Sequence, residues 1–295
     1  MLQNKVAVIT GAASGIGEAA ARLFVKEGAR VVLGDIQGDK VSQLAGELGG
    51  DRAVAQDADV AAEEDIQRLA ATALDTFGGL DVWCSNAAGL PAAAAAGDLL
   101  HAGYYGRTGL YSSEALMESL DAAEFDKQVQ VNLRGVVLGT KHAARAMKAR
   151  GGGGGCIINT TSIAGLEVNC ATHGDPAFVA AGGKHGVVAL TKLAACELAP
   201  YRIRVNAVAP GYTATPMLAK VMGLEGASKE EFVAEVAKAS VMPGVALLPE
   251  DIAHGRLYLA SDLGRCVNGH TLVIDNGVLA GVAGYVPGLK VPVGV

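Results

Sequence analysis

The feature that most constrains this chain is a glycine-rich turn between an apolar run and a helical stretch. Residues 6–9 are apolar, and the segment Thr10-Gly11-Ala12-Ala13-Ser14-Gly15-Ile16-Gly17 follows them directly. In a strand–turn–helix unit, glycines at this spacing allow a tight turn, close approach of a pyrophosphate and close packing of the helix on the strand. The first N–H groups of the helix are then free to hold phosphate. The segment predicts a dinucleotide site, with an ordinary tight turn as the alternative.

A second apolar run supports this interpretation. Val31-Val32-Leu33-Gly34-Asp35 ends in an acid, about 20 residues after the turn, where a carboxylate binds the hydroxyl pair of a ribose. We therefore expect Asp35 to hold the ribose. The residues expected to hold the phosphates are Gly11, Ser14, Gly15, Ile16 and Gly17.

Alternation of apolar runs and helical patterns continues along the chain. Hydrophobic residues make up 51% and charged residues 18%, which favours a parallel sheet buried on both faces. We predict one α/β domain over residues 1–295, a Rossmann-like doubly wound parallel sheet of about seven strands with helices on both faces. Strands are expected at 6–9, 31–35, 53–56, 80–84, 156–159, 203–208 and 271–275. Helices are expected at 37–48, 61–77, 122–149, 178–198 (interrupted at Gly182-Gly183) and 250–261.

The alternation lapses at about residues 90–120. A loop of this length inside a compact domain is usually functional or disordered. Because it follows the fourth strand, we interpret it as a cover over the substrate crevice, with a mobile insertion as the alternative.

Charge and cysteine content exclude several classes of function. The net charge is −6 without a basic tract, so we expect neither a nucleic acid nor a membrane as partner. The five cysteines are scattered without metal-ligand spacing, which predicts no metal site and a reducing compartment. No apolar run has transmembrane length, and a strand begins too early for a signal peptide. These features predict a cytoplasmic location.

Together, these motifs resemble the short-chain dehydrogenase/reductase family over nearly the whole chain. After the glycine turn, the matching positions are, in order, Asp59-Val60, Asn86-Ala87, Asn132, Ser162, Lys184 and Pro210-Gly211. Segments 23–25, 34–37 and 139–145 are similar to the plant group that includes xanthoxin and secoisolariciresinol dehydrogenases. The resemblance implies that NAD is the cofactor, preferred over NADP because Asp35 repels a 2′-phosphate. It also implies that the cofactor contacts Asp59, Val60, Asn86, Lys184 and Thr215, and that helices 122–149 and 176–198 form a homodimer or homotetramer.

The resemblance further implies four catalytic roles, of which three are filled. Ser162 would polarise the substrate oxygen, Asn132 would hold a relay water, and Lys184 would bind the ribose and lower the pKa of a neighbouring phenol. From its apolar surroundings alone, Asn132 is either a local backbone clamp or a site residue. Asn86-Ala87-Ala88-Gly89 departs from the family's Asn-Ala-Gly turn, which affects the floor of the nicotinamide pocket.

The fourth role belongs to a tyrosine four residues before the lysine, a spacing that puts both side chains on one helix face. Ala180 stands there, and the nearest aromatic residue, Phe178, lies six positions from Lys184. Gly182-Gly183 resembles a two-residue insertion between them, and on either alignment the catalytic tyrosine is missing. Loss of a positioned general acid or base costs about 10²–10⁴ in rate.

Three functions remain open. The first is an NAD-dependent oxidoreductase acting on a secondary alcohol or ketone of a small apolar metabolite, with a substitute proton donor or a reduced rate. The second is a non-redox enzyme, an isomerase or cyclase, on the same fold. The third is a catalytically silent NAD-binding protein. The extent of the resemblance favours the first, and the missing phenol supports the other two.

Overall fold

The fold is built on one parallel sheet, which covers both halves of the chain. The computed structural model describes residues 1–89, 121–150, 154–167, 175–238 and 240–281. Its strands are β1 (Val6–Thr10), β2 (Arg30–Asp35), β3 (Ala53–Asp57), β4 (Val82–Ser85), β5 (Gly155–Thr160), β6 (Ile203–Pro210) and β7 (Thr271–Ile274). They lie in the order β3-β2-β1-β4-β5-β6-β7, all in parallel. The predicted doubly wound sheet is confirmed.

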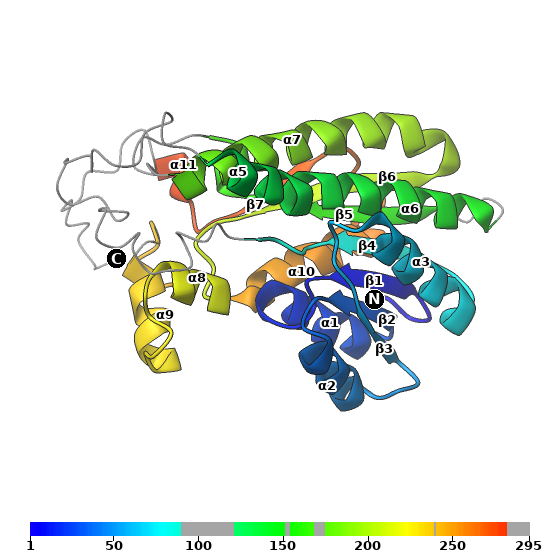
Figure 1. Ribbon diagram of the computed structural model, residues 1–295, viewed down its shortest axis with the longest axis horizontal. Coiled ribbons are helices and arrows are strands. Elements are labelled where there is room, and N and C mark those ends of the chain that lie inside the picture. Colours follow the sequence, from blue (N-terminus) through cyan, green and yellow to red (C-terminus); the bar gives the residue numbers. More distant parts are fainter. Residues whose placement is uncertain (90–120, 151–153, 168–174, 239, 282–295) are drawn as a thin grey trace.

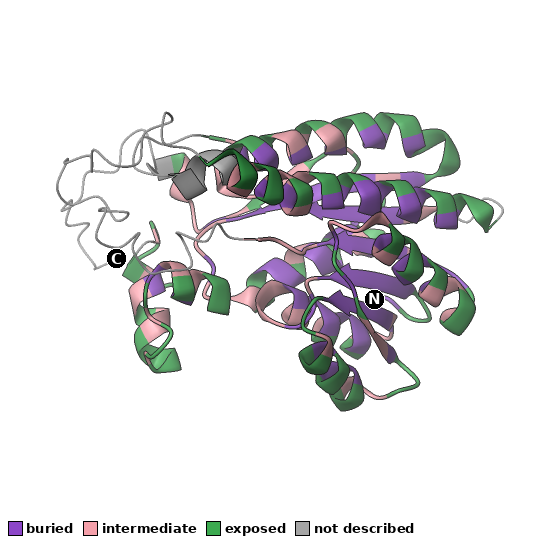
Figure 2. Cartoon of the chain, in the orientation of Figure 1, coloured by how far each residue is buried: buried purple, intermediate pink, exposed green. Residues whose placement is uncertain are grey.

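Helices cover the sheet on both sides (Figure 1). One face carries α1 (Gly15–Lys26), α2 (Gly38–Leu48) and α10 (Pro249–Ala260). The other carries α3 (Glu63–Phe77), α6 (Gly135–Ala149) and α7 (Asp175–Leu198). Alternate strand residues enter the two cores, as where Ile9 packs on one side and Val8 on the other. The five central strands are therefore buried on both faces (Figure 2), whereas the edge strands β3 and β7 are only partly buried. Burial on both faces explains the apolar runs of the central strands.

The remaining helices lie mainly around the carboxyl edge of the sheet. They are α5 (Ala122–Val129), α8 (Pro216–Val221), α9 (Lys229–Lys238) and α11 (Val278–Gly281). Parallel strands deliver their following loops to this edge, and the order of the strands reverses between β1 and β4. A crevice at such a reversal is where doubly wound sheets bind ligands.

Two helices differ from the prediction. The stretch predicted as one helix over 122–149 contains a π-helical turn, Gln130–Arg134, between α5 and α6. The predicted interruption at Gly182-Gly183 is wrong, since α7 is helical from Asp175 to Leu198. Two glycines in a helix interior cost about 1 kcal/mol each, and packing of α7 on the sheet and on the π-helical turn offsets that cost.

The predicted substrate cover at 90–120 lies outside the described residues. In the part of the chain that the structure describes, no helix has both the length and the apolar character needed to cross a membrane.

Candidate functional site

The glycine turn closes against the end of β4 with no room for side chains. Gly11 has φ of 65°, and a Cβ there would lie 2.7 Å from the Cα of Ala87. A Cβ on Gly17 would collide with the carbonyl oxygen of Gly11. This close packing fixes the shape of the turn at the start of α1, as a phosphate-binding turn requires.

The start of α1 offers unpaired donors to that crevice. Ser14 is the N-cap residue, but its side chain makes no capping hydrogen bond. The N–H groups of the first turn, which includes Ile16, have no acceptors within the helix. Gly15 lies against Thr215, whose Cγ2 would be 3.2 Å from a Cβ on that glycine. Thr215 caps α8 by accepting a hydrogen bond from the N–H of Leu218 at 3.2 Å. The turn between β6 and α8 therefore lies against the predicted phosphate site.

Asp35 is held at the glycine turn. Its Oδ2 accepts a hydrogen bond from the N–H of Ala13, and its Oδ1 accepts one from the N–H of Gln37, both at 3.0 Å. Asp35 is 9% exposed, and the next residue, Ile36, is 70% exposed. This arrangement gives a fixed acceptor beside an open apolar surface, as an adenosine needs.

Asp59 and Val60 follow β3 at the same edge of the sheet. Asp59 is exposed; its N–H donates to Asp65 at 2.8 Å and its Oδ1 accepts from the N–H of Ala61 at 2.9 Å. Val60 is 7% exposed and packs on Gly135 at the start of α6. Both residues therefore border the crevice from the β3 side.

Asn86 joins the glycine turn to the end of β4. Its Nδ2 donates to the carbonyl oxygen of Gly11 at 2.9 Å. The hydroxyl of Thr10 accepts from the N–H groups of Asn86 and Ala87, at 3.0 and 3.2 Å. The two turns on either side of the strand-order reversal are thus bonded into one unit.

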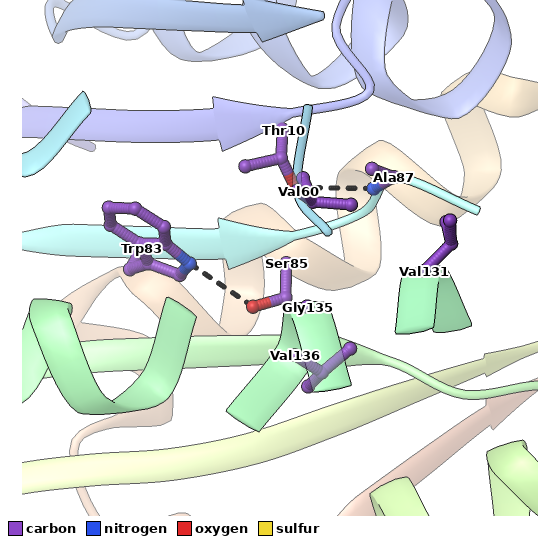
Figure 3. A pocket seen from close by; sticks show the side chains of 8 residues that line it. All are labelled: Thr10, Val60, Trp83, Ser85, Ala87, Val131, Gly135 and Val136. Carbon is purple, nitrogen blue, oxygen red and sulfur yellow. Dashed lines mark hydrogen bonds between the residues drawn. The ribbon is translucent and has the colours of Figure 1, made fainter. Parts of the chain in front are cut away.

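A small hollow lies beside this unit, between the strand ends, the π-helical turn and the start of α6 (Figure 3). Its walls include Val60, Trp83 and Val131, and the indole N–H of Trp83 donates to the hydroxyl of Ser85 at 3.1 Å. Its lining contains none of the three predicted catalytic residues. We therefore assign it to packing behind the site.

Asn132 lies in the π-helical turn and is 3% exposed. Its amide accepts from the N–H of Gly89 and donates to the carbonyl oxygen of Gly89, both at 3.2 Å. It also donates to Gln128 at 2.9 Å. These contacts make Asn132 a clamp on the turn after β4, which is one of its two predicted roles; the relay role stays a prediction.

Ser162 and Lys184 both lie near the end of β5. The Ser162 hydroxyl accepts from the N–H of Ala164 at 3.2 Å, which orients it at the start of a short 3₁₀ turn. Lys184 is 7% exposed and donates from Nζ to the carbonyl oxygen of Thr160 at 2.9 Å. Burial, and secondarily the nearby Arg256, lower the pKa of Lys184 to about 8. The ammonium is therefore close to titration at neutral pH.

Arg256 of α10 is not among the residues predicted from the sequence, although the sequence carries a signal for it. Arg256 is the cation among apolar residues at helical spacing, such as Ile252 and Leu259, which marks it as facing the core. It is fully buried and donates from Nη2 to Asn86 at 2.6 Å and to Thr160 at 2.7 Å. Burial lowers its pKa to about 10, so the guanidinium stays charged at neutral pH.

The predicted residues therefore gather along one edge of the sheet in two groups, one around the glycine turn and one at the end of β5. The closely packed glycine turn, the absence of a side-chain cap at Ser14 and the fixed carboxylate of Asp35 fit a dinucleotide. Among the described residues, no three His, Cys, Asp or Glu side chains form a group that could hold a metal ion.

Comparisons with known proteins agree with this geometry. Residues 11–279 match a family model described as enoyl-(acyl carrier protein) reductase. A mitochondrial borneol dehydrogenase from Lavandula x intermedia is 39% identical, over 94% of this chain and 91% of the relative. A (+)-cis,cis-nepetalactol synthase from Nepeta racemosa is 37% identical, over 94% and 93%.

A solved structure of a reductase is also similar to this chain. The 3-ketoacyl-(acyl-carrier-protein) reductase of Brucella melitensis, in complex with NADH, superposes with a TM-score of 0.74 and 31% identity, over 94% of this chain and 99% of that one. Both the matching family model and these relatives cover nearly the whole chain. The chain belongs to the short-chain dehydrogenase/reductase family.

Proposed function

We propose that this protein is an NAD-dependent oxidoreductase that acts on a secondary alcohol or ketone of a small apolar metabolite, with an atypical active site. The observation that carries the proposal is the glycine turn, which the side chains of Asp35 and Asn86 bond from opposite sides. The relative named borneol dehydrogenase supports an apolar alcohol as substrate.

In the proposed reaction the residues of this chain bind the dinucleotide, orient the substrate and stabilise negative charge. The bound dinucleotide supplies the hydride chemistry at its nicotinamide ring. The first turn of α1 holds the phosphates, and Asp35 holds the adenosine ribose. Ser162 orients the substrate oxygen, and the Lys184 ammonium binds the second ribose and stabilises negative charge nearby. The turn after β4 is held in place because the amide of Asn132 bonds both the N–H and the carbonyl oxygen of Gly89.

A second candidate is a non-redox enzyme, an isomerase or cyclase, on the same fold. Ala180 stands four residues before Lys184, where the family has its proton-transferring tyrosine. In addition, one relative is named as a synthase rather than a dehydrogenase. A silent NAD-binding protein is a third candidate, supported by the same alanine.

Binding and turnover assays separate these candidates. We expect purified protein to quench or shift NADH fluorescence, and to change absorbance at 340 nm with members of a panel of monoterpenoid alcohols and ketones that includes borneol. Binding without any change at 340 nm would contradict the first candidate. Product analysis by mass spectrometry on the same panel then distinguishes the second candidate from the third.

The preference for NAD over NADP has its own test at Asp35. Replacing this carboxylate by a hydroxyl, Asp35→Ser, removes the ribose acceptor and the repulsion of a 2′-phosphate. We expect about tenfold weaker NADH binding and a relative gain for NADPH. Asp39→Ser, at an exposed carboxylate in the first turn of α2, is the matched control. Equal loss of affinity for both dinucleotides would contradict the ribose assignment.

The homodimer or homotetramer stays a prediction. It is supported by two exposed apolar side chains, Val137 on α6 and Leu193 on α7, which are 39% and 58% exposed. Light scattering on the purified protein tests it. The cytoplasmic location also stays a prediction.

A further inference from the structure

Arg256 is a buried cation without an acidic partner in the described structure. Its side chain is fully buried, and its Nε and Nη1 have no acceptor among the residues that the structure describes. None of the ion pairs formed by those residues includes it. Burying an uncompensated charge is costly. Packing alone therefore does not account for an arginine at this position.

Lys184 is a second buried cation at the same place. Arg256 donates to the hydroxyl of Thr160, and Lys184 donates to the carbonyl oxygen of the same residue. Thr160 ends β5, and Asn86, the other acceptor for Arg256, follows β4. Two positive charges thus lie at neighbouring strand ends, on the carboxyl edge of the sheet.

We propose that Arg256 determines which oxidation state of the dinucleotide this site prefers, by favouring NADH over NAD⁺. The proposal rests on the proposed function, in which the nicotinamide end of the dinucleotide lies at Asn86 and Lys184. The oxidised nicotinamide ring carries a positive charge, and the reduced ring is neutral. Both forms carry the same two phosphates, so attraction to phosphate cancels in the ratio of their affinities.

The size of the effect follows from the charge. At an effective dielectric constant of about 20, a unit charge on the order of 10 Å from the ring changes the affinity ratio by about tenfold. Salt does not remove the effect, since a buried charge is screened much less than an exposed one. A site that binds NADH more tightly than NAD⁺ stabilises the reduced dinucleotide against the oxidised one while both are bound.

Binding titrations on the full chain test the proposal. NADH is titrated by fluorescence, and NAD⁺ by competition with bound NADH, in the unchanged protein and in Arg256→Gln, Arg256→Met and Arg256→Lys. We expect the unchanged protein to bind NADH more tightly. Both neutral variants should lower the ratio of the NAD⁺ to the NADH dissociation constant by about tenfold. Arg256→Lys keeps the charge and should keep the ratio, even where it weakens the contacts to Asn86 and Thr160.

A matched control comes from the opposite end of the sheet. Arg204 lies near the start of β6 and donates to the carbonyl oxygens of Leu259 and Val267, at 2.7 and 3.2 Å. Arg204→Gln also removes a partly buried cation, but far along the strand from the crevice. We expect Arg204→Gln to have the same ratio of NAD⁺ to NADH dissociation constants as the unchanged protein. A fall as large as that in Arg256→Gln would overturn the proposal, because the position of the charge would then not matter.

The remaining outcomes are also decisive. If Arg256→Gln does not fold, Arg256→Met replaces it, because apolar residues of similar volume often replace buried charges without loss of stability. An unchanged ratio in either folded neutral variant, or equal affinities for both forms in the unchanged protein, overturns the inference and leaves the proposed function standing. If the unchanged protein binds neither dinucleotide, the proposed function fails and the inference fails with it.

Discussion

The glycine turn and the segment around Lys184 lie at the same edge of the sheet. The first contains all the groups expected from the sequence motifs, whereas the second contains only some of them. At the glycine turn, Asp35 and Asn86 bond the backbone, and Gly11 and Gly17 allow backbone packing too close for any side chain. Around Lys184, the ammonium bonds one carbonyl oxygen and faces a second buried cation. The position four residues earlier holds Ala180. The first region fits the proposed dinucleotide, and the second has an alanine at the position where the resemblance to the family places a proton donor.

Under the proposed function, cofactor binding and proton transfer depend on separate regions of this fold. The dinucleotide region depends on backbone shape, which comes from strand ends and glycines. The proton-transfer region depends on individual side chains on a single helix. A substitution in the second region can change the reaction without disturbing the first.

The largest effect is expected from adding a phenol at position 180. Since α7 is continuous across Gly182-Gly183, position 180 lies one helical turn before Lys184, on the same face. We expect Ala180→Tyr to raise dehydrogenase kcat/KM by about 10²–10⁴, measured at 340 nm on the best substrate of the panel. NADH affinity should stay unchanged.

Phe178→Tyr is the matched control for that variant. It adds the same phenol six residues before Lys184, and about 100° of rotation per residue turns it about 120° away. No gain is expected. Equal rates in both variants and the unchanged protein would mean that the proton comes from another group.

A second test uses the stability cost of the buried lysine. Lys184 has a pKa of about 8 in the folded chain, against 10.5 for the free side chain. Between these values the unfolded chain holds a proton that the folded chain has released, so the free energy of unfolding rises with pH. The rise attributable to Lys184 is on the order of 3 kcal/mol.

Urea unfolding at pH 7, 8, 9 and 10 measures this rise. Lys184→Met removes the titrating group, so the variant should lack that part of the rise and be more stable than the unchanged protein at pH 7. Lys192→Met, at an exposed lysine on the same helix, should follow the unchanged protein. Parallel curves for the unchanged protein and Lys184→Met would show that the ammonium is well solvated.

The smallest effect is expected at the glycine turn, on NADH affinity. A Cβ on Gly17 collides with the carbonyl oxygen of Gly11, so Gly17→Ala must displace the turn. Overpacking of this kind costs about 1–3 kcal/mol, and we expect NADH affinity to fall by about 10- to 100-fold. Gly46→Ala, where a Cβ in α2 would meet no atom within 4 Å, should keep NADH affinity and slightly raise the melting temperature. Similar NADH affinity in both variants would contradict the tight-turn argument.

Local patterns predicted much of the fold. The apolar runs of the strands, the glycine turn and the acid at the end of β2 can each be identified in short windows of sequence. This works because a strand buried on both faces needs a continuous apolar run. The same windows misjudged α7, because two adjacent glycines indicate a break when helix propensity is considered alone. In the fold, Gly183 is buried and would bring a Cβ to 3.8 Å from that of Asn132, so packing keeps the helix intact.

The sequence by itself determined the parallel sheet, the dinucleotide turn and the absence of a tyrosine four residues before Lys184. Only the tertiary structure decided how distant side chains meet. Asn132 clamps a turn 43 residues earlier, and Arg256 bonds Asn86 across 170 residues. Such contacts depend on helix placement over the sheet and on the π-helical turn, which no local periodicity encodes. Backbone shape follows short-range patterns, whereas the charges around Lys184 depend on which helices the folded sheet brings to its carboxyl edge.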